Sequence, residues 1–351
     1  MNINADILKW TKNVSSTWDV LIELSYNKCI FNTSKWIDLL YEAYHFEPSL
    51  VILHRNNEVI GGVPIMKLKN NLSGLRIVSL PFSDKCDPMF KGEHEIKIIG
   101  EALRKYQVDN RVSKMELRSE YSDVADFQIF SAGYTHITRL TNNVEEVFQR
   151  FKKTQIQQRI LKVKKESVLE IEKKTDQEAL RTFYRLHLHT RRRIRAIPQP
   201  WKFFQLLGEK LLSKGYGFVE LVKFNNTTIA AAIFLTAYNT ITYKYSASLP
   251  IYWKYHPNHL MLWDAIQYGC KNGYKKFDWG RTNLMDEALR QFKLGWGSEE
   301  HIQNYTKSGT KVDLIERRIA FFRFIISRML PILPLSFIRL TGKIFYNKLG
   351  Y

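Results

Sequence analysis

Two cations and one acid that can act on a carbonyl or an anion lie close together in this sequence. Asp278 and Arg281 belong to the stretch 277–282 (FDWGRT), and Lys293 belongs to the stretch 290–297 (RQFKLGWG). A guanidinium binds phosphate or carboxylate through two parallel hydrogen bonds, and a fixed ammonium stabilises an oxyanion. These residue types indicate a site for an anionic or carbonyl-bearing substrate. An ordinary amphipathic helix with surface cations is the alternative.

The residues between the cations predict the elements that hold them. Gly280 permits a tight turn at the end of a short strand, because glycine adopts positive φ without steric cost. Asn283, with Asp286 three residues later, resembles a capping box and predicts the start of a helix. Gly295 predicts the end of that helix. The two cations are therefore expected at turns at the two ends of one short helix.

The composition limits the kind of protein that carries this segment. The chain has 351 residues, enough for about two domains, and its 45% apolar and 25% charged residues are typical of a globular protein. The 53 Lys and Arg against 34 Asp and Glu give a net charge of +19. This excess predicts an acidic partner, which can be a nucleic acid, a phosphate-bearing substrate or an anionic membrane.

Cysteine usage and the N-terminus predict a cytoplasmic protein without a metal site. Cys29, Cys86 and Cys270 are too widely spaced for a disulfide framework or a metal-ligand motif. Residues 1–10 lack the charged and apolar regions of a signal peptide. The sequence also lacks a phosphate loop, a dinucleotide fingerprint and a zinc motif, so no bound cofactor is expected.

Two parts of the chain share one pattern of elements. Residues 51–63 and 221–232 each read as strand, Asn-Asn turn, strand, and Asn suits the positive φ of a tight hairpin. A helical pattern precedes each hairpin, and a helix and a strand follow it: 34–44, 95–106 and 114–118 in the first part, 178–191, 259–271 and 276–279 in the second. The repeat predicts an α/β chain with a mixed sheet, built by duplication.

A basic amphipathic segment, 150–165, lies between the two copies. Its cations alternate with apolar residues in helical spacing. It either covers a domain junction with a solvated face or offers an electrostatic surface to phosphate or RNA. The segment lacks the interleaved aromatic residues that stack on single strands, which weakens the RNA interpretation.

The chain resembles the FemAB-related (BioF2-like) branch of the GNAT-type acyltransferases between about residues 30 and 300. The matching stretches, in order, are 31–37 (FNTSKWI), 80–84 (LPFSD), 184–193 (YRLHLHTRRR), 257–263 (PNHLMLW), 277–282 (FDWGRT) and 292–297 (FKLGWG). The resemblance implies two tandem GNAT-like domains and transfer of an acyl group to an amine. Fem enzymes proper use aminoacyl-tRNA and a peptidoglycan precursor, and relatives are associated with acyl-CoA and other envelope or polysaccharide building blocks.

The resemblance assigns roles to individual residues. Lys293 takes the oxyanion-stabilising role, Asp278 is the candidate base or clamp, and Arg281 is placed to bind a donor phosphate or carboxylate. Asp278 paired with Arg281 in a purely structural role is the alternative. The further substrate-binding candidates are Phe292, Trp296, Tyr243, Tyr245, Arg191, Asn258, and the loop residues Ser83 and Asp84 for an acceptor. The chain lacks the Q/R-x-x-G-x-G/A pyrophosphate loop of acetyl-CoA-dependent GNAT enzymes, so the donor stays open between acyl-CoA and aminoacyl-tRNA.

The C-terminal residues 311–351 differ from the rest of the chain. One face of a predicted helix carries Ile315, Ile319, Phe322, Ile326 and Leu330, and Pro331 and Pro334 end it. Arg323 and Arg328 each cost roughly 2.5–3.5 kcal/mol near a bilayer centre, which argues against a membrane span. The sequence predicts a basic amphipathic helical tail that lies on an anionic membrane surface or packs on the second domain.

These observations define one preferred function and one alternative. We expect a first GNAT-like domain over 1–145 on the acceptor side, a second over 146–310 on the donor and catalytic side, and the tail over 311–351. The preferred function is N-acyl transfer to an amino group of a cell-envelope saccharide or peptidoglycan precursor, at the inner face of the membrane. The alternative is a catalytically silent GNAT-like module that binds an envelope glycan or RNA, with tRNA as a further partner.

Overall fold

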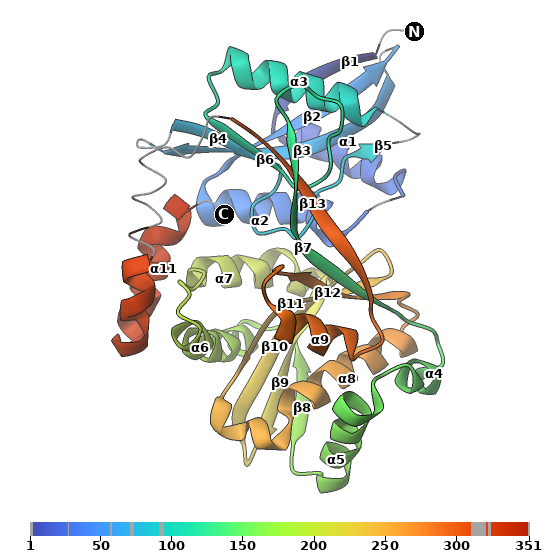
Figure 1. Cartoon of the computed structure of the whole chain (residues 1–351), viewed down its shortest axis with the longest axis vertical. Helices are drawn as coiled ribbons and strands as arrows, with labels where there is room; N and C mark the ends of the chain where they lie inside the picture. The colour runs from blue at the N-terminus through green and yellow to red at the C-terminus, as the bar shows by residue number, and fades with distance from the viewer. Residues whose placement is uncertain are drawn as a thin grey trace. The chain divides into compact units, whose positions relative to one another are not determined.

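The computed structural model divides the chain into two compact units. It describes residues 3–26, 28–56, 58–70, 74–90, 95–309, 321 and 324–349 (Figure 1). Unit 1 comprises residues 1–132, 303–326 and 347–351, and unit 2 comprises residues 133–302 and 327–346. Unit 2 begins at residue 133, before the domain boundary that we expected between residues 145 and 146. Residues 303–310, which we expected in the second domain, belong to unit 1.

Unit 1 contains a mixed sheet in the order β1-β2-β3-β4-β6-β13, with β5 paired to β3. The strands are β1 (Ile3–Lys9), β2 (Glu47–Arg55), β3 (Glu58–Asn70), β4 (Gly74–Val78), β5 (Met89–Phe90), β6 (Lys114–Leu117) and part of β13 (Glu299–Gly309). The helices are α1 (Lys12–Glu23), η1 (Ile30–Asn32), α2 (Ser34–Tyr44) and α3 (Ile96–Asp109). The alternation of helices and strands confirms the predicted mixed α/β class.

Unit 2 contains a sheet in the order β7-β12-β11-β10-β9-β8. The strands are part of β7 (Gln128–Arg139), β8 (Glu170–Lys174), β9 (Gly217–Phe224), β10 (Thr227–Ala237), β11 (Thr240–Ser248) and β12 (Lys276–Thr282). The helices are α4 (Val144–Gln149), η2 (Lys153–Gln157), α5 (Gln158–Glu166), α6 (Gln177–Arg193), α7 (Trp201–Lys210), η3 (Leu212–Lys214), η4 (Pro250–Tyr255), α8 (Pro257–Lys271), α9 (Glu287–Leu294), η5 (Leu330–Ile332) and most of α11 (Leu335–Leu349). Figure 1 shows α6 and α7 on one side of these strands and α8 on the other.

The two units repeat one strand topology. In unit 1, β2, β3 and β4 are antiparallel neighbours, and β6 then pairs parallel with β4 after the crossover helix α3. In unit 2, β9, β10 and β11 are antiparallel neighbours, and β12 then pairs parallel with β11 after the crossover helix α8. The order helix, hairpin, helix, strand that the sequence shows twice therefore corresponds to the same topology built twice.

The last strand of each sheet comes from the other half of the chain. β13 follows β12 in sequence, but its residues Thr306–Gly309 pair with β6 in unit 1. β7 follows β6 in sequence, but its residues 134–139 pair with β12 in unit 2. Each repeat therefore completes the sheet of the other, and neither half of the chain contains all the strands of one unit.

The hairpin turns take the backbone conformation that the sequence predicts. Asn225 and Asn226, between β9 and β10, have φ of 47° and 60°. A two-residue hairpin turn with both residues at positive φ matches the right-handed twist of its strands. In the first repeat Asn56 has φ of 51°, and Asn57 lies outside the described residues. The predicted Asn-Asn turn between β9 and β10 is confirmed.

An aromatic core holds α8 and the 150–165 segment against the sheet of unit 2. Phe218, Phe234 and Phe277 from the strands pack with Trp263 of α8. From the segment 150–165, Phe151, Ile156 and Ile160 belong to the same buried cluster. This segment therefore covers the core of unit 2 with its apolar side.

Most of the predicted tail helix, including Ile315, Ile319, Phe322 and Arg323, lies outside the described residues. Further along, Leu330, Ile338 and Tyr346 are buried, so η5 and α11 pack on other parts of the chain. No helix in the described ranges is long and apolar enough to cross a membrane.

A buried carboxyl group lies in the sheet of unit 2. Glu220 on β9 is fully buried, and its Oε1 lies 3.5 Å from Lys173 Nζ, which also lies 3.3 Å from Asp264 Oδ2. Burial and the neighbouring Asp264 raise the pKa of Glu220 well above its ordinary value, against the opposing effect of Lys173.

This raised pKa makes the stability depend on pH. The protonated carboxyl contributes its full stabilisation below the ordinary pKa of about 4.3 and loses it as the pH rises through the higher folded-state value. We expect Glu220→Gln, which stays neutral, to gain about 1 kcal/mol over the wild type at pH 8 and to match it near pH 4. Urea unfolding at several pH values measures this difference, with the exposed Glu170→Gln on β8 as the control. A variant less stable than the wild type at pH 8 would show instead that Glu220 is ionised and paired with Lys173.

Candidate active site

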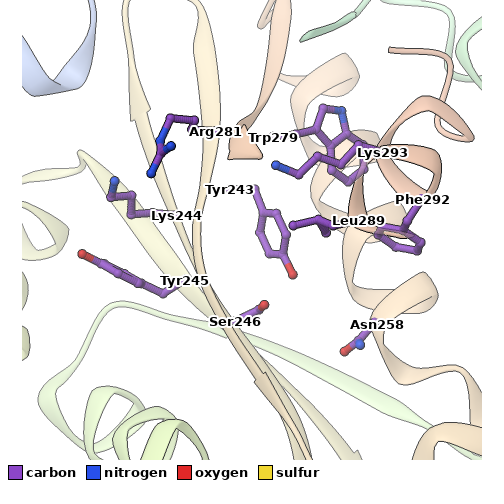
Figure 2. Close-up of a pocket in the computed structure, with 10 residues that line it drawn as sticks. All are labelled: Tyr243, Lys244, Tyr245, Ser246, Asn258, Trp279, Arg281, Leu289, Phe292 and Lys293. Atoms are coloured by element: carbon purple, nitrogen blue, oxygen red, sulfur yellow. The ribbon is translucent and has the colours of Figure 1, made fainter. Parts of the chain in front are cut away.

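A pocket of about 430 Å³ opens in unit 2 where two parallel strands separate (Figure 2). β11 and β12 pair through Thr240–Thr242 and Lys276–Asp278, and the described ladder between them ends there. The pocket is lined by Tyr243, Lys244, Tyr245 and Ser246 from β11, Trp279 and Arg281 from β12, Leu289, Phe292 and Lys293 from α9, and Asn258 from α8. The separation of the two strands therefore creates the space that α9 and the start of α8 enclose.

A β-bulge sets the direction of the β11 side chains. Tyr243 lies opposite Phe234 of β10, whereas Tyr245 lies opposite the residue before Phe234, which leaves Lys244 as the extra residue. The ring of Tyr243 stacks on Phe234 with centroids 5.5 Å apart, and the ring of Tyr245 contacts Phe204 of α7 at 5.5 Å. Simple alternation would place both tyrosines on one face of the sheet. The bulge turns them to opposite faces, and both border the pocket at the strand edge.

A second bulge, in β12, explains Gly280 and Asp278. Asp278 pairs with Ile137 and Arg281 pairs with Thr135, so β12 has one extra residue between them. Gly280 adopts φ of 67°, a conformation that side chains disfavour. Asp278 Oδ1 accepts a hydrogen bond of 2.8 Å from the Gly280 N–H. Asp278 does not line the pocket and instead supports the bulge that carries Arg281.

Lys293 is a buried cation at the end of α9. Its side chain reaches the pocket although the residue is only 3% exposed. Its Nζ donates a hydrogen bond of 2.8 Å to the Gly280 carbonyl. A buried ammonium requires such a partner, because desolvation of an unpaired charge is costly. The β12 bulge therefore fixes the position of the ammonium.

The start of α9 differs from the prediction. Asp286 is the N-cap and accepts a hydrogen bond of 3.1 Å from the Leu289 N–H. Asn283 instead accepts from the Met285 N–H in the preceding turn, so the capping box predicted there is wrong. Because both residues are good N-caps, the sequence alone does not distinguish them.

Trp296 lies beneath the pocket rather than in its wall. Its side chain is fully buried, and its ring contacts Trp279 at 5.4 Å and Phe292 at 6.1 Å. The Trp296 carbonyl accepts a hydrogen bond of 3.1 Å from the Thr138 hydroxyl, whose oxygen accepts one of 2.9 Å from Trp279 Nε1. The tryptophan pair thus joins β7, β12 and the end of α9 under the site.

A buried polar network that the sequence does not reveal lies next to Lys293. His136 of β7 is fully buried, with Nε2 2.9 Å from Glu300 Oε2 and Nδ1 3.4 Å from the Thr282 hydroxyl. Arg290 of α9 binds Glu300 through two hydrogen bonds of 2.7 Å. Burial, followed by the Lys293 cation, lowers the pKa of His136, so this imidazole is neutral near pH 7. The network fixes α9, and with it Lys293, against the sheet.

The charge of the pocket is positive. Its ten described lining residues include Lys244, Arg281 and Lys293, and none of them is Asp, Glu or His. Figure 2 shows the Lys293 head group on the α9 side of the strands and the Arg281 and Lys244 head groups on the other side. Burial raises the pKa of Tyr243 to about 12, so its phenol keeps its proton at neutral pH. The pocket therefore offers cations and hydrogen-bond donors to an anionic or carbonyl-bearing ligand.

Asn258 brings the start of α8 to the pocket. It is the second residue of this helix, whose N-terminal end carries a partial positive charge. Its Oδ1 is buried and has no hydrogen-bond partner among the described residues, while its Nδ2 lies 3.5 Å from the Ser248 hydroxyl. A buried amide with an unused acceptor at a cavity wall is typical of a ligand-binding position.

The structure places the other sequence candidates elsewhere. Arg191 donates a hydrogen bond of 3.0 Å to Gln199 Oε1, which joins the end of α6 to the following loop. Ser83 is buried in unit 1 and accepts from Trp36 Nε1 at 2.8 Å, and the Asp84 carbonyl accepts from the Tyr305 hydroxyl. Of the eleven candidates, Tyr243, Tyr245, Asn258, Arg281, Phe292 and Lys293 line the pocket, and Asp278, Trp296, Arg191, Ser83 and Asp84 do not.

Sequence reasoning did not select Lys244, Ser246 or Leu289, which also line the pocket. Lys244 and Ser246 alternate with the two selected tyrosines, and a regular strand would direct them away from the cleft. Only the bulge in β11 brings consecutive residues to one cavity. Leu289 resembles any apolar residue of an amphipathic helix.

The segment that contains the whole pocket matches a known family. Residues 150–301 match the family model described as an acetyltransferase (GNAT) domain. This segment is therefore a GNAT acetyltransferase domain, and the chain is an acyltransferase of the GNAT type. No protein sequence of curated function matches the chain.

Solved structures with the same fold extend over nearly the whole chain. FemX is 14% identical with a TM-score of 0.66, covering 91% of this chain and 100% of FemX. A tandem GNAT protein from the clavulanic acid biosynthesis pathway is 9% identical with a TM-score of 0.56, covering 88% and 100% of the two chains. L-PGS from Bacillus licheniformis is 12% identical with a TM-score of 0.54, covering 90% and 96%. The chain thus has a FemX-like and tandem-GNAT-like fold.

The role of Asp278 in the bulge can be tested by two substitutions. Asp278→Ala removes the acceptor of the Gly280 N–H, so we expect a loss of about 1 kcal/mol in the free energy of unfolding. Asp278→Asn keeps an acceptor oxygen at the same place and is expected to lose less than half of that. Urea unfolding measures both values. Equal losses for the two variants would contradict a structural hydrogen bond as the role of this side chain.

Proposed function

We propose that the protein transfers an acyl or aminoacyl group from a phosphate-bearing donor to an amino group of a cell-envelope saccharide or peptidoglycan precursor. The donor is an acyl-CoA or an aminoacyl-tRNA. The observation that carries the proposal is the pocket of the GNAT domain: the described residues that line the gap between β11 and β12 include three cations and no acidic residue.

The donor has a matching surface along β11. β11 continues beyond Thr242, where its ladder with β12 ends, and its residues Tyr243 to Ser246 line the pocket. Arg281 and Lys244 supply charge for donor phosphates, and Asn258 with the start of α8 supplies further donors.

The chemistry needs oxyanion stabilisation and proton transfer. The acceptor nitrogen attacks the donor carbonyl, the C–N bond forms, and the C–S or C–O bond to the donor breaks. The proton of the attacking amine passes to the departing sulfur or oxygen. Lys293, fixed by the Gly280 carbonyl, stabilises the tetrahedral oxygen, and the neutral phenol of Tyr243 donates a hydrogen bond to the leaving group.

The acceptor amine enters this mechanism already deprotonated. Among the described residues of the pocket none is a carboxylate or an imidazole, so the wall supplies no general base. Asp278 is engaged by the Gly280 N–H, which leaves the mechanism to Lys293 and Tyr243. On the acceptor side, the loop of unit 1 that contains Ser83 and Asp84 is the proposed recognition element, as the family resemblance implies.

Substitution of Lys293 tests the oxyanion role. We expect Lys293→Met to lower kcat about 10²- to 10³-fold, since methionine fills the same space without a charge or a donor. Lys276→Met, at an exposed position on β12, is the matched control and keeps full activity. Circular dichroism shows whether each variant is folded. A folded Lys293→Met enzyme with wild-type kcat would remove this residue from the mechanism.

Substitution of Arg281 tests the donor site. Arg281→Ala is expected to raise the KM for the donor about tenfold or more, because it removes charge-assisted hydrogen bonds to the ground-state phosphate. Changes in kcat should be smaller. Arg139→Ala, an exposed position on the neighbouring β7, serves as the control. An unchanged donor KM would place the phosphates elsewhere.

The reaction itself is identified by supplying both donor classes. The purified protein is incubated with a donor, either an acyl-CoA or an aminoacyl-tRNA, and with an acceptor, either an amino sugar or a peptidoglycan precursor. Mass spectrometry then measures the masses of the products. A new acyl or aminoacyl mass on the acceptor amine is the expected result. Saturable binding of a glycan or RNA without turnover of any donor would favour the catalytically silent module instead.

A further inference from the structure

Helix α11 is anchored to unit 2 by one face. Ile338 is fully buried and Tyr346 is 4% exposed. Gly342 lies so close to the chain after α6 that a Cβ at this position would come within 2.5 Å of the Pro198 carbonyl oxygen. These contacts fix the rotation of α11 (red in Figure 1) about its own axis.

The opposite face of α11 presents large apolar side chains to solvent. Phe337, Leu340 and Ile344 are 56%, 47% and 44% exposed. Their spacing of three and four residues places them in one line along a helix. We call these three residues the outer stripe. Ile332, in η5 just before the helix, is 79% exposed. A contiguous exposed apolar patch of this kind marks an interaction surface.

The charged residues near the outer stripe in the sequence are all basic. Arg339 and Lys343 are exposed on the same helix. Residues 321–351 contain five basic residues and no Asp or Glu: Arg323, Arg328, Arg339, Lys343 and Lys348. An apolar stripe bordered by Lys and Arg is the pattern of a helix that lies in the interface of an anionic bilayer. The net charge of +19 disfavours a second copy of the chain on this face.

We propose that the outer stripe of α11 binds the surface of a membrane that contains anionic lipids, with the helix axis in the plane of the membrane. The apolar side chains enter the boundary between headgroups and acyl chains, and the flanking cations bind the headgroup phosphates. With 15 residues, α11 is shorter than the roughly 20 residues that span a bilayer. This inference concerns where the protein binds and is independent of the reaction proposed above.

Vesicle sedimentation tests the proposal. The full chain is mixed with vesicles of phosphatidylcholine alone or with an equal part of phosphatidylglycerol. We expect binding to the anionic vesicles that weakens as salt is raised. A triple variant should lower the affinity for the anionic vesicles at least about tenfold, since the apolar contact area is lost. It combines Phe337→Ser, Leu340→Ser and Ile344→Ser. Because these side chains are exposed, the variant should unfold at the same temperature as the wild type.

Two further variants make the test specific. Val20→Ser with Leu24→Ser removes exposed apolar side chains, 63% and 53% accessible, at the end of α1, and should leave vesicle binding unchanged. Arg339→Gln with Lys343→Gln should reduce the preference for anionic over neutral vesicles.

Three outcomes would overturn the proposal. The wild-type protein could stay in solution with both vesicle types, or the triple variant could bind the vesicles as tightly as the wild type does. Light scattering could also show that the outer stripe holds two copies of the chain together. Activity on a water-soluble acceptor tests the proposed acyl transfer without a membrane, so failure of membrane binding can be distinguished from failure of the proposed function. The triple variant should retain that activity, because none of the described residues that line the pocket belongs to α11.

Discussion

The hydrogen bond from Lys293 Nζ to the Gly280 carbonyl is the contact on which the site depends. It joins the last turn of α9 to the bulge of β12 and gives a buried ammonium the partner that it needs. Asp278 holds the same bulge from the other side. Because the bulge also carries Arg281 toward the pocket, one local distortion of a strand positions both cations.

The pocket exists because two neighbouring strands stop pairing. β11 and β12 share a short parallel ladder and then separate, and each strand contains an extra residue near the point of separation. Bulges increase twist and bend a strand, which opens a sheet edge without breaking the core. The packed tryptophans and the His136 network keep this opening rigid from below. A site formed in this way can be pre-organised for charge that develops in a reaction.

The positive charge of the chain has at least two separate locations. Three cations face the pocket of the GNAT domain, where phosphate-bearing donors are proposed to bind. Another group accompanies the apolar outer stripe of α11, where no acidic residue interrupts it. The net charge alone does not locate these two groups of cations, because it is a sum over the whole chain. The apolar neighbours of each group distinguish a substrate pocket from a surface.

The sequence by itself determined the repeated order of elements, the Asn-Asn hairpin turn between β9 and β10, and the end of a short helix before Gly295, because these depend on local periodicity and turn chemistry. Six of its eleven site candidates line the pocket. Only the tertiary structure decided the bulge at Lys244, the contact of His136 with Glu300, and the exchange of β7 and β13 between repeats. A one-residue change of register and a contact between distant strands leave no local pattern, since both arise from packing that forms only when the chain has folded.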